Sequence, residues 1–197
     1  MPQHFPLFRP SRSAGLALCG IIAALVLTAQ QPAYAEPAAP MSEYEAKARI
    51  LEQFTRFIEW PEAALPADLP FTLCILGNDP FGPHLKRATD GRKMGSHAIV
   101  IRPLTNPDDA LQCQLVFVAR GERAALQRVT AKTGGKPVLT VGDGAGFAEQ
   151  GLLLNFYLAS ETVRFEANPR AIQRSGLKVS ARLLKLARLV GPAGPGV

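Results

Sequence analysis

The segment FTLCIL at residues 71–76 is an almost unbroken apolar run of strand length that stops at Gly77. Two similar runs follow at residues 115–118 and 137–141, and segments with a helical pattern stand before and between them. Strands that are apolar along their whole length are typical of a parallel sheet with helices on both faces. The sequence therefore predicts an α/β domain built on a mostly parallel sheet.

The helices expected around these strands begin with one over residues 43–60. Ser42 and Glu45 form a capping box, apolar residues then recur at steps of three and four, and Pro61 disfavours helical geometry at the residue before it. Similar signals predict the remaining elements, namely helices over residues 81–89, 120–133, 169–174 and 180–190 and a strand over residues 98–102.

The C-terminal part of the chain departs from this alternation. Residues 152–158 and 162–167 predict a β-hairpin that adds antiparallel strands to the sheet. In its second arm, Arg164 and Glu166 alternate with apolar residues, which places both charges on the face opposite the apolar pair. There they either form an ion pair on an exposed face or line a pocket.

A basic stripe is expected on the last helix, because Arg182, Lys185 and Arg188 recur every three residues. Two interpretations remain open. The stripe is either a solvated face with cations near a helix C-terminus, or a docking surface for an acidic partner.

The first 35 residues have the pattern of an export signal. Two arginines precede an apolar run of signal length, and small residues at Ala33 and Ala35 predict cleavage after Ala35. The alternatives are an uncleaved anchor, for which the run is shorter than the roughly 20 residues needed, and a lipoprotein at Cys19, where the preceding Leu18 is too large. We expect a flexible start at residues 36–41, a single domain over 42–190 and a disordered tail at 191–197.

Export would change both the charge and the cysteine count of the chain. Loss of Arg9 and Arg12 lowers the formal net charge from +6 to +4, and the sequence contains no Lys/Arg block, so we do not expect a nucleic-acid partner. Loss of Cys19 leaves Cys74 and Cys113, and an even pair in an oxidising compartment predicts a disulfide. Two buried free thiols are the alternative.

Motifs for catalysis, metals or cofactors are absent from the sequence. It has no nucleophile elbow, no zinc-protease motif and no phosphate loop, and His84 and His97 lack a second ligand at a metal spacing. The glycine-rich segment 142–147 superficially suggests a dinucleotide loop, but Phe147 stands where its third glycine should be. We therefore predict a turn there, and a protein that is not an enzyme and holds no metal or cofactor.

A ligand crevice is nevertheless expected at one edge of the sheet. Loops at the carboxyl ends of parallel strands surround the usual binding crevice of such folds. Residues 77–79, Arg120 and Asp143 follow three predicted strands and should all lie on that edge.

The chain resembles the YfiR-like family along residues 42–190. The resemblance is carried, in order, by YEAKA at residues 44–48, FTRFIEWP at 54–61, LCILGNDPF at 73–81, VRFEAN at 163–168 and SGLKVS at 175–180. It implies a periplasmic, non-enzymatic α/β protein, often dimeric, that restrains a membrane-bound diguanylate cyclase by contacting its periplasmic part and so lowers cyclic di-GMP. The alternative is a periplasmic small-molecule or muropeptide binding protein that acts as a sensor for another membrane partner.

The resemblance also assigns roles to a few residues. Cys74 and Cys113 match the family's disulfide pair, and Glu166 matches a glutamate implicated in envelope or ligand contacts. Lys178 and Ser180 stand where ligand-binding members carry an arginine and a histidine, and a second cysteine pair found in some members is missing. The residues that we expect to bind a partner or ligand are Glu166, Arg164, Asn168, Lys178, Arg182 and Asp143.

Overall fold

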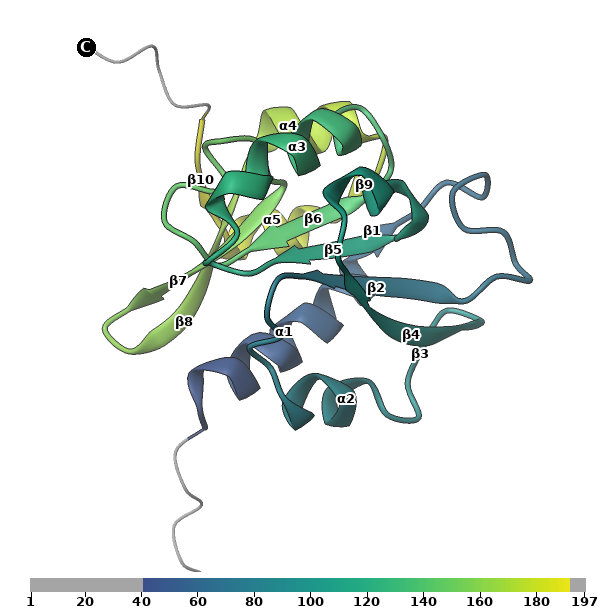
Figure 1. Cartoon of the computed structure of the whole chain (residues 1–197), viewed down its shortest axis with the longest axis horizontal. Helices are drawn as coiled ribbons and strands as arrows, with labels where there is room; N and C mark the ends of the chain where they lie inside the picture. Colours follow the sequence, from purple (N-terminus) through teal and green to yellow (C-terminus); the bar gives the residue numbers. More distant parts are fainter. Residues whose placement is uncertain (1–40, 192–197) are drawn as a thin grey trace, which may run out of the picture. The chain divides into compact units, whose positions relative to one another are not determined.

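The computed structural model describes residues 41–191 (Figure 1). The export signal, its cleavage site, and the flexible segments expected at 36–40 and 192–197 lie outside the described residues. In chain order the elements are α1 (Glu43–Phe57), β1 (Ile58–Glu59), β2 (Phe71–Leu76), α2 (Pro83–Thr89), β3 (Lys93–Met94), β4 (His97–Leu104), the 3-10 helix η1 (Pro107–Gln112), β5 (Leu115–Val118), α3 (Arg123–Thr133), β6 (Leu139–Gly142), β7 (Leu154–Ala159), β8 (Thr162–Ala167), α4 (Pro169–Ser175), β9 (Lys178–Val179), α5 (Ala181–Leu186) and β10 (Arg188–Leu189). None of the helices among these elements is long and apolar enough to span a bilayer.

The main sheet has eight strands in the order β10-β8-β7-β6-β5-β2-β4-β3. Pairing is parallel from β4 through β2, β5 and β6 to β7, and antiparallel within the β7–β8 hairpin. Every residue of β2, β5 and β6 is buried, which explains why these strands read as continuous apolar runs. The predicted α/β fold, with an antiparallel hairpin added to a mostly parallel sheet, is confirmed.

Two apolar clusters lie on either side of the sheet. The larger joins α1 and α2 to the sheet through residues such as Leu51, Phe54 and Leu85, and Phe54 stacks on Phe156 of β7. The smaller joins α3 and η1 to the opposite face through residues such as Leu126 and Val129. In Figure 1, α1 and α2 lie below the sheet and α3 lies above it.

The first helix begins as predicted and ends earlier. Ser42 caps it, its side-chain oxygen accepting a hydrogen bond from the amide of Glu45 at 3.2 Å. We predicted a helix as far as residue 60, but it ends at Phe57 because Ile58 and Glu59 pair with β9 in a separate two-stranded sheet. The helical pattern carries no signal for that long-range pairing.

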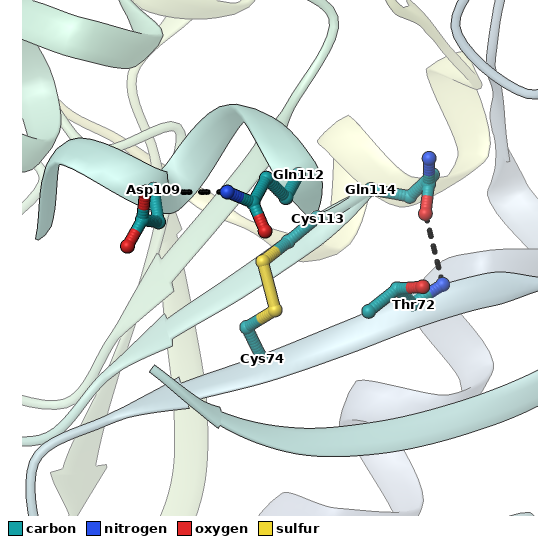
Figure 2. The surroundings of a disulfide bond; sticks show 6 residues. All are labelled: Thr72, Cys74, Asp109, Gln112, Cys113 and Gln114. Atoms are coloured by element: carbon teal, nitrogen blue, oxygen red, sulfur yellow. Dashed lines mark hydrogen bonds between the residues drawn. A yellow bond between two sulfur atoms is a disulfide. The ribbon is translucent and has the colours of Figure 1, made fainter. Parts of the chain in front are cut away.

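The predicted disulfide between Cys74 and Cys113 is confirmed (Figure 2). Cys74 belongs to β2, and Cys113 caps the end of η1 just before the neighbouring strand β5. Beside it, Gln114 accepts a hydrogen bond from the amide of Thr72 through its side-chain oxygen at 2.9 Å. The bridge thus fixes η1 against the centre of the sheet.

The end of the chain differs from the prediction of one helix over residues 180–190. Helix α5 ends at Leu186, and Arg188 and Leu189 form β10, which pairs in parallel with Glu166 and Ala167 of β8. The extended backbone brings Arg188 to the buried carboxylate of Glu166, and the amide of Val190 donates to the carbonyl of Ala167. The predicted stripe on one helix is therefore wrong, because Arg182 and Lys185 lie on α5 and Arg188 lies on a strand.

Candidate functional site

A crevice of about 350 Å³ lies where the carboxyl ends of β5 and β6 meet the β7–β8 hairpin. It is lined by residues of four parts of the fold: Glu43 and Lys47 from α1; Arg120, Asp143, Ala145, Gly146 and Glu149 from the loops after β5 and β6; Asn155, Phe156, Tyr157, Leu158 and Glu166 from the hairpin; and Arg188 from β10. Arg120 and Asp143 thus line a crevice at the predicted edge, whereas residues 77–79, which we expected beside them, do not line it.

The hairpin forms one wall because it is longer than the strand beside it. β6 ends at Gly142, which pairs with Asn155, whereas β7 continues to Ala159. Figure 1 shows the hairpin projecting beyond the neighbouring strands. At its turn, Ser160 and Glu161 both adopt positive φ angles of 46° and 64°, the backbone of a tight turn that matches the twist of the strands.

Asp143 is the centre of a buried charge cluster on the α1 side of the crevice. Its Oδ2 atom accepts hydrogen bonds from Tyr44 Oη at 2.8 Å, Lys47 Nζ at 2.9 Å and Arg120 Nη2 at 3.2 Å. The side chains of Lys47 and Asp143 are 1% and 0% exposed, while that of Arg120 is 53% exposed. The cluster ties the first turns of α1 to the ends of two central strands.

These contacts change the titration of two neighbours in α1. Burial and the hydrogen bond to Asp143 raise the pKa of Tyr44 to about 12, so its hydroxyl stays protonated and donates. Burial alone would raise the pKa of Glu43, but hydrogen bonds and charge interactions with Lys47 and Arg120 outweigh it and lower that pKa. Glu43 is therefore held as a carboxylate between two cations.

Glu166 forms a second charged group on the hairpin side. Its carboxylate accepts a hydrogen bond from Asn155 Nδ2 at 3.1 Å and is bound by the Arg188 guanidinium. Arg188, 56% exposed, lies over the ring of Tyr157 with its guanidinium carbon 4.3 Å from the ring centroid. The hydrogen bond with Glu166 raises the pKa of Arg188, and the slight desolvation of the guanidinium offsets this only in part.

Two buried acceptors of the crevice have no partner. Asp143 Oδ1 and Asn155 Oδ1 accept no hydrogen bond from any described residue. An unsatisfied buried polar atom costs about 1–3 kcal/mol, so such atoms are uncommon in folded proteins.

The glycine-rich loop after β6 is the turn that we predicted. Gly146 has a φ of +74°, and Gly144 lies so close to the buried ring of Phe147 that any side chain there would overlap it. Phe147 thus fills the space under the loop in which a dinucleotide loop would place its glycine backbone against a phosphate.

The structure brings together two of the six residues that we expected to bind a partner or ligand. Asp143 and Glu166 line the same crevice. Arg164 is exposed on β8 and does not pair with Glu166, whose cation is Arg188. Asn168 is buried and caps α4, its Oδ1 accepting from the amide of Ala171 at 3.0 Å.

Lys178 and Arg182 lie elsewhere. Lys178 is exposed on β9, opposite Glu59, and Arg182 is exposed on α5, so neither lines the crevice. Their roles in binding, like those of Arg164 and Asn168, stay predictions.

Sequence reasoning missed several residues of the crevice, above all Lys47, Asn155 and Arg188. Lys47 carried a readable signal, since it lies on the same helical face as Tyr44 and Leu51. A lysine on an apolar face indicates a buried partner. Asn155 likewise interrupts an otherwise apolar strand. Arg188 had no such signal, because its position depends on β10.

Comparison with known proteins agrees with this fold. The family model described as YfiR/HmsC-like matches residues 44–188. A solved structure described as a conserved domain protein from Vibrio cholerae has a TM-score of 0.53 at 9% identity, covering 75% of this chain and 60% of that one, so this chain spans less than two thirds of its length. The ABC domain from Streptococcus pneumonia in complex with L-Trp has a TM-score of 0.48 at 9% identity, covering 71% of this chain and 61% of that one. Because the family model spans nearly all of the described residues, the chain belongs to the YfiR/HmsC-like family of regulatory proteins.

Proposed function

We propose that this protein is a periplasmic regulator that binds the periplasmic portion of a membrane-bound diguanylate cyclase and restrains it, which lowers cyclic di-GMP. The observation that carries the proposal is the YfiR/HmsC-like match over residues 44–188. The export pattern of residues 1–35 supports the location, with cleavage after Ala35. By the same resemblance, the active form is a homodimer.

A regulator without enzymatic activity agrees with the chemistry of the crevice. The residues that line it include no serine, threonine, cysteine or histidine, so it offers no serine- or cysteine-type nucleophile with an imidazole base. The Oδ2 atom of Asp143, a candidate base, already accepts hydrogen bonds from three side chains. The charged side chains around Asp143 are thus held in ion pairs and hydrogen bonds, which suits a structural or binding role better than proton transfer.

Deletion of the gene tests the proposal. In a strain that carries the cognate cyclase, deletion should raise cyclic di-GMP, and in a strain without that cyclase it should change nothing. Complementation with the full chain should restore the low level, whereas a chain that lacks residues 2–35 should not. Periplasmic cross-linking should recover the cyclase. Unchanged cyclic di-GMP together with no recovered cyclase would contradict the proposal.

A second candidate function is supported by the crevice itself. We propose that it binds a small molecule, so that the protein acts as a sensor for its membrane partner. Support comes from the volume of about 350 Å³ and from the two buried acceptors that lack a donor. Thermal-shift measurements against nucleotides, amino acids and muropeptides test this, and a flat response across the panel counts against it.

A further inference from the structure

The crevice has more hydrogen-bond acceptors than donors to match them. In the Asp143 cluster, Glu43 and Asp143 are balanced by Lys47 and Arg120. On the opposite wall, Glu166 is balanced by Arg188. Glu149 remains, an exposed carboxylate that forms no ion pair with any residue in the described range. The lining therefore carries one carboxylate in excess.

The unpartnered atoms are of the same kind. Asp143 Oδ1 and Asn155 Oδ1 are both acceptors, and the side chains that carry them are almost completely buried. With the carboxylate of Glu149, three of the lining residues carry an acceptor group that no described side chain satisfies. A primary ammonium group carries three N–H donors and one positive charge, which matches both the number of these acceptor groups and the excess charge.

Arg120 and Arg188, which pair with the buried carboxylates of Asp143 and Glu166, are placed so that they can move aside for a ligand. Arg120 and Arg188 come from opposite walls, and each is more than half exposed. Each guanidinium also lies over a tyrosine ring, that of Tyr44 for Arg120 and that of Tyr157 for Arg188. Long side chains with charged ends in water change rotamer at low cost, in contrast to the buried Lys47.

We propose that this crevice binds a small molecule with a primary ammonium group, held by Asp143, Asn155 and Glu149. The inference rests on the second proposed function and names its ligand class. The volume of about 350 Å³ suits a molecule the size of an amino acid or a small diamine. Where the ligand also carries a carboxylate, the exposed guanidiniums of Arg120 and Arg188 are its partners.

Calorimetric titration of the full protein, purified from the periplasm, tests this. The probes are putrescine and L-lysine, which carry ammonium groups, with butane-1,4-diol and diacetyl-lysine as analogues without them and glutarate as an anion. We expect saturable binding of putrescine or L-lysine and none of the two analogues without an ammonium group. Binding of glutarate alone, or of those two analogues equally well, would overturn the ligand class.

Two substitutions locate the site, and a third is their control. Glu149→Gln removes the excess carboxylate and should weaken amine binding at least tenfold. Ala145→Trp, at an exposed position of the lining, should block the crevice for any ligand. Glu62→Gln removes an exposed carboxylate that does not line the crevice and should leave binding unchanged. Thermal unfolding confirms that each variant is folded. Amine binding that persists in both crevice variants would place the site elsewhere and overturn the proposal.

The result is separable from the restraint of a cyclase. If no amine binds, but deletion of the gene still raises cyclic di-GMP, the ligand class is wrong and the regulatory function stands. If amines bind as expected and cyclic di-GMP does not respond to the gene, the crevice is a ligand site in a protein with another output.

Discussion

Asp143, at the end of β6, and Lys47, in the second turn of α1, form an ion pair of 2.9 Å that is closed to solvent at both ends. The two residues are 96 positions apart in the sequence. Their contact joins the first helix to the middle of the sheet, and it places a lysine where the helical pattern calls for an apolar residue.

Substitution of Lys47 by Met should destabilise the protein by about 3 kcal/mol. Removal of one partner of a buried ion pair leaves an uncompensated charge and costs about 3–5 kcal/mol, and Arg120 remains to offset part of this. The measurement is urea unfolding at neutral pH. Arg49→Met, which breaks only an exposed pair with Glu45 on the same helix, should change stability by about 0.5 kcal/mol or less. Equal effects of the two variants would contradict the account of a buried pair.

Stability should fall in acid through Glu43. Its pKa in the folded protein lies below the ordinary value of 4.5, so the unfolded chain binds the proton more readily. The contribution of Glu43 to the free energy of unfolding is complete above pH 4.5, and it is lost as the pH falls through the lowered pKa. Urea midpoints measured across this range should decrease less steeply for Glu43→Gln than for the unchanged protein. Parallel curves would show that Glu43 contributes nothing.

Loss of the disulfide should destabilise the protein by about 3–4 kcal/mol in the chain-entropy model, because the bridged residues are 39 positions apart. Thermal unfolding of the Cys74→Ala/Cys113→Ala double variant provides the measurement. The unchanged protein with a strong reductant should match this variant. Non-reducing mass spectrometry gives the control, and two free thiols in periplasmic protein would contradict the prediction directly.

Substitution of Arg188 by Gln should loosen the C-terminal strand. The buried carboxylate of Glu166 loses its cation, which costs about 1–3 kcal/mol, and 1.4 kcal/mol corresponds to a factor of ten. The amide of Val190, which donates to Ala167, should therefore exchange with deuterium about tenfold faster or more. Arg182→Gln on α5 serves as the matched control, since Arg182 is exposed and its side chain forms no ion pair within residues 41–191. Unchanged exchange at Val190 would mean that the backbone pairing alone holds β10.

Replacement of Ser160 and Glu161 in the hairpin turn by Asn and Gly should stabilise the protein. Both positions have positive φ, which costs most residues about 1–2 kcal/mol, whereas the pair Asn-Gly adopts this turn readily. We expect stabilisation of about 1–2 kcal/mol in urea unfolding. Ser160→Ala/Glu161→Ala keeps the strain and should give no gain. A gain of the same size in both double variants would point to a cause other than the backbone.

Local patterns were sufficient for most of the fold. The apolar runs of β2, β5 and β6, the cap at Ser42 and the hairpin strands each carry their signal within a few residues. The errors lie where distant segments pair. The end of α1 follows from pairing with β9, and the end of α5 follows from pairing with β8. Neither partner can be read from the segment itself, because short strands gain their stability from the neighbour.

The sequence predicted where the site residues lie better than it predicted which residues they pair with. Asp143 and Arg120 follow adjacent strands, so their shared edge could be inferred before their contact was seen. We predicted a helix from residue 120, but α3 begins at Arg123, and this leaves Arg120 in a turn from which it reaches Asp143. Glu166 was assigned correctly to the polar face of its strand, whereas its pairing with Arg188 depended on a strand that no periodicity indicated.

The contacts of Tyr44 and Lys47 with Asp143 bear on the order in which the parts of the fold can form. Synthesis delivers the chain from its N-terminus, so Tyr44 and Lys47 emerge long before Asp143, which stands 99 and 96 positions later. Until that residue arrives, the helix start has a charged lysine on its apolar face and no counter-ion from the sheet. A nascent chain that ends before residue 143 therefore lacks the contacts that join the start of its first helix to the sheet.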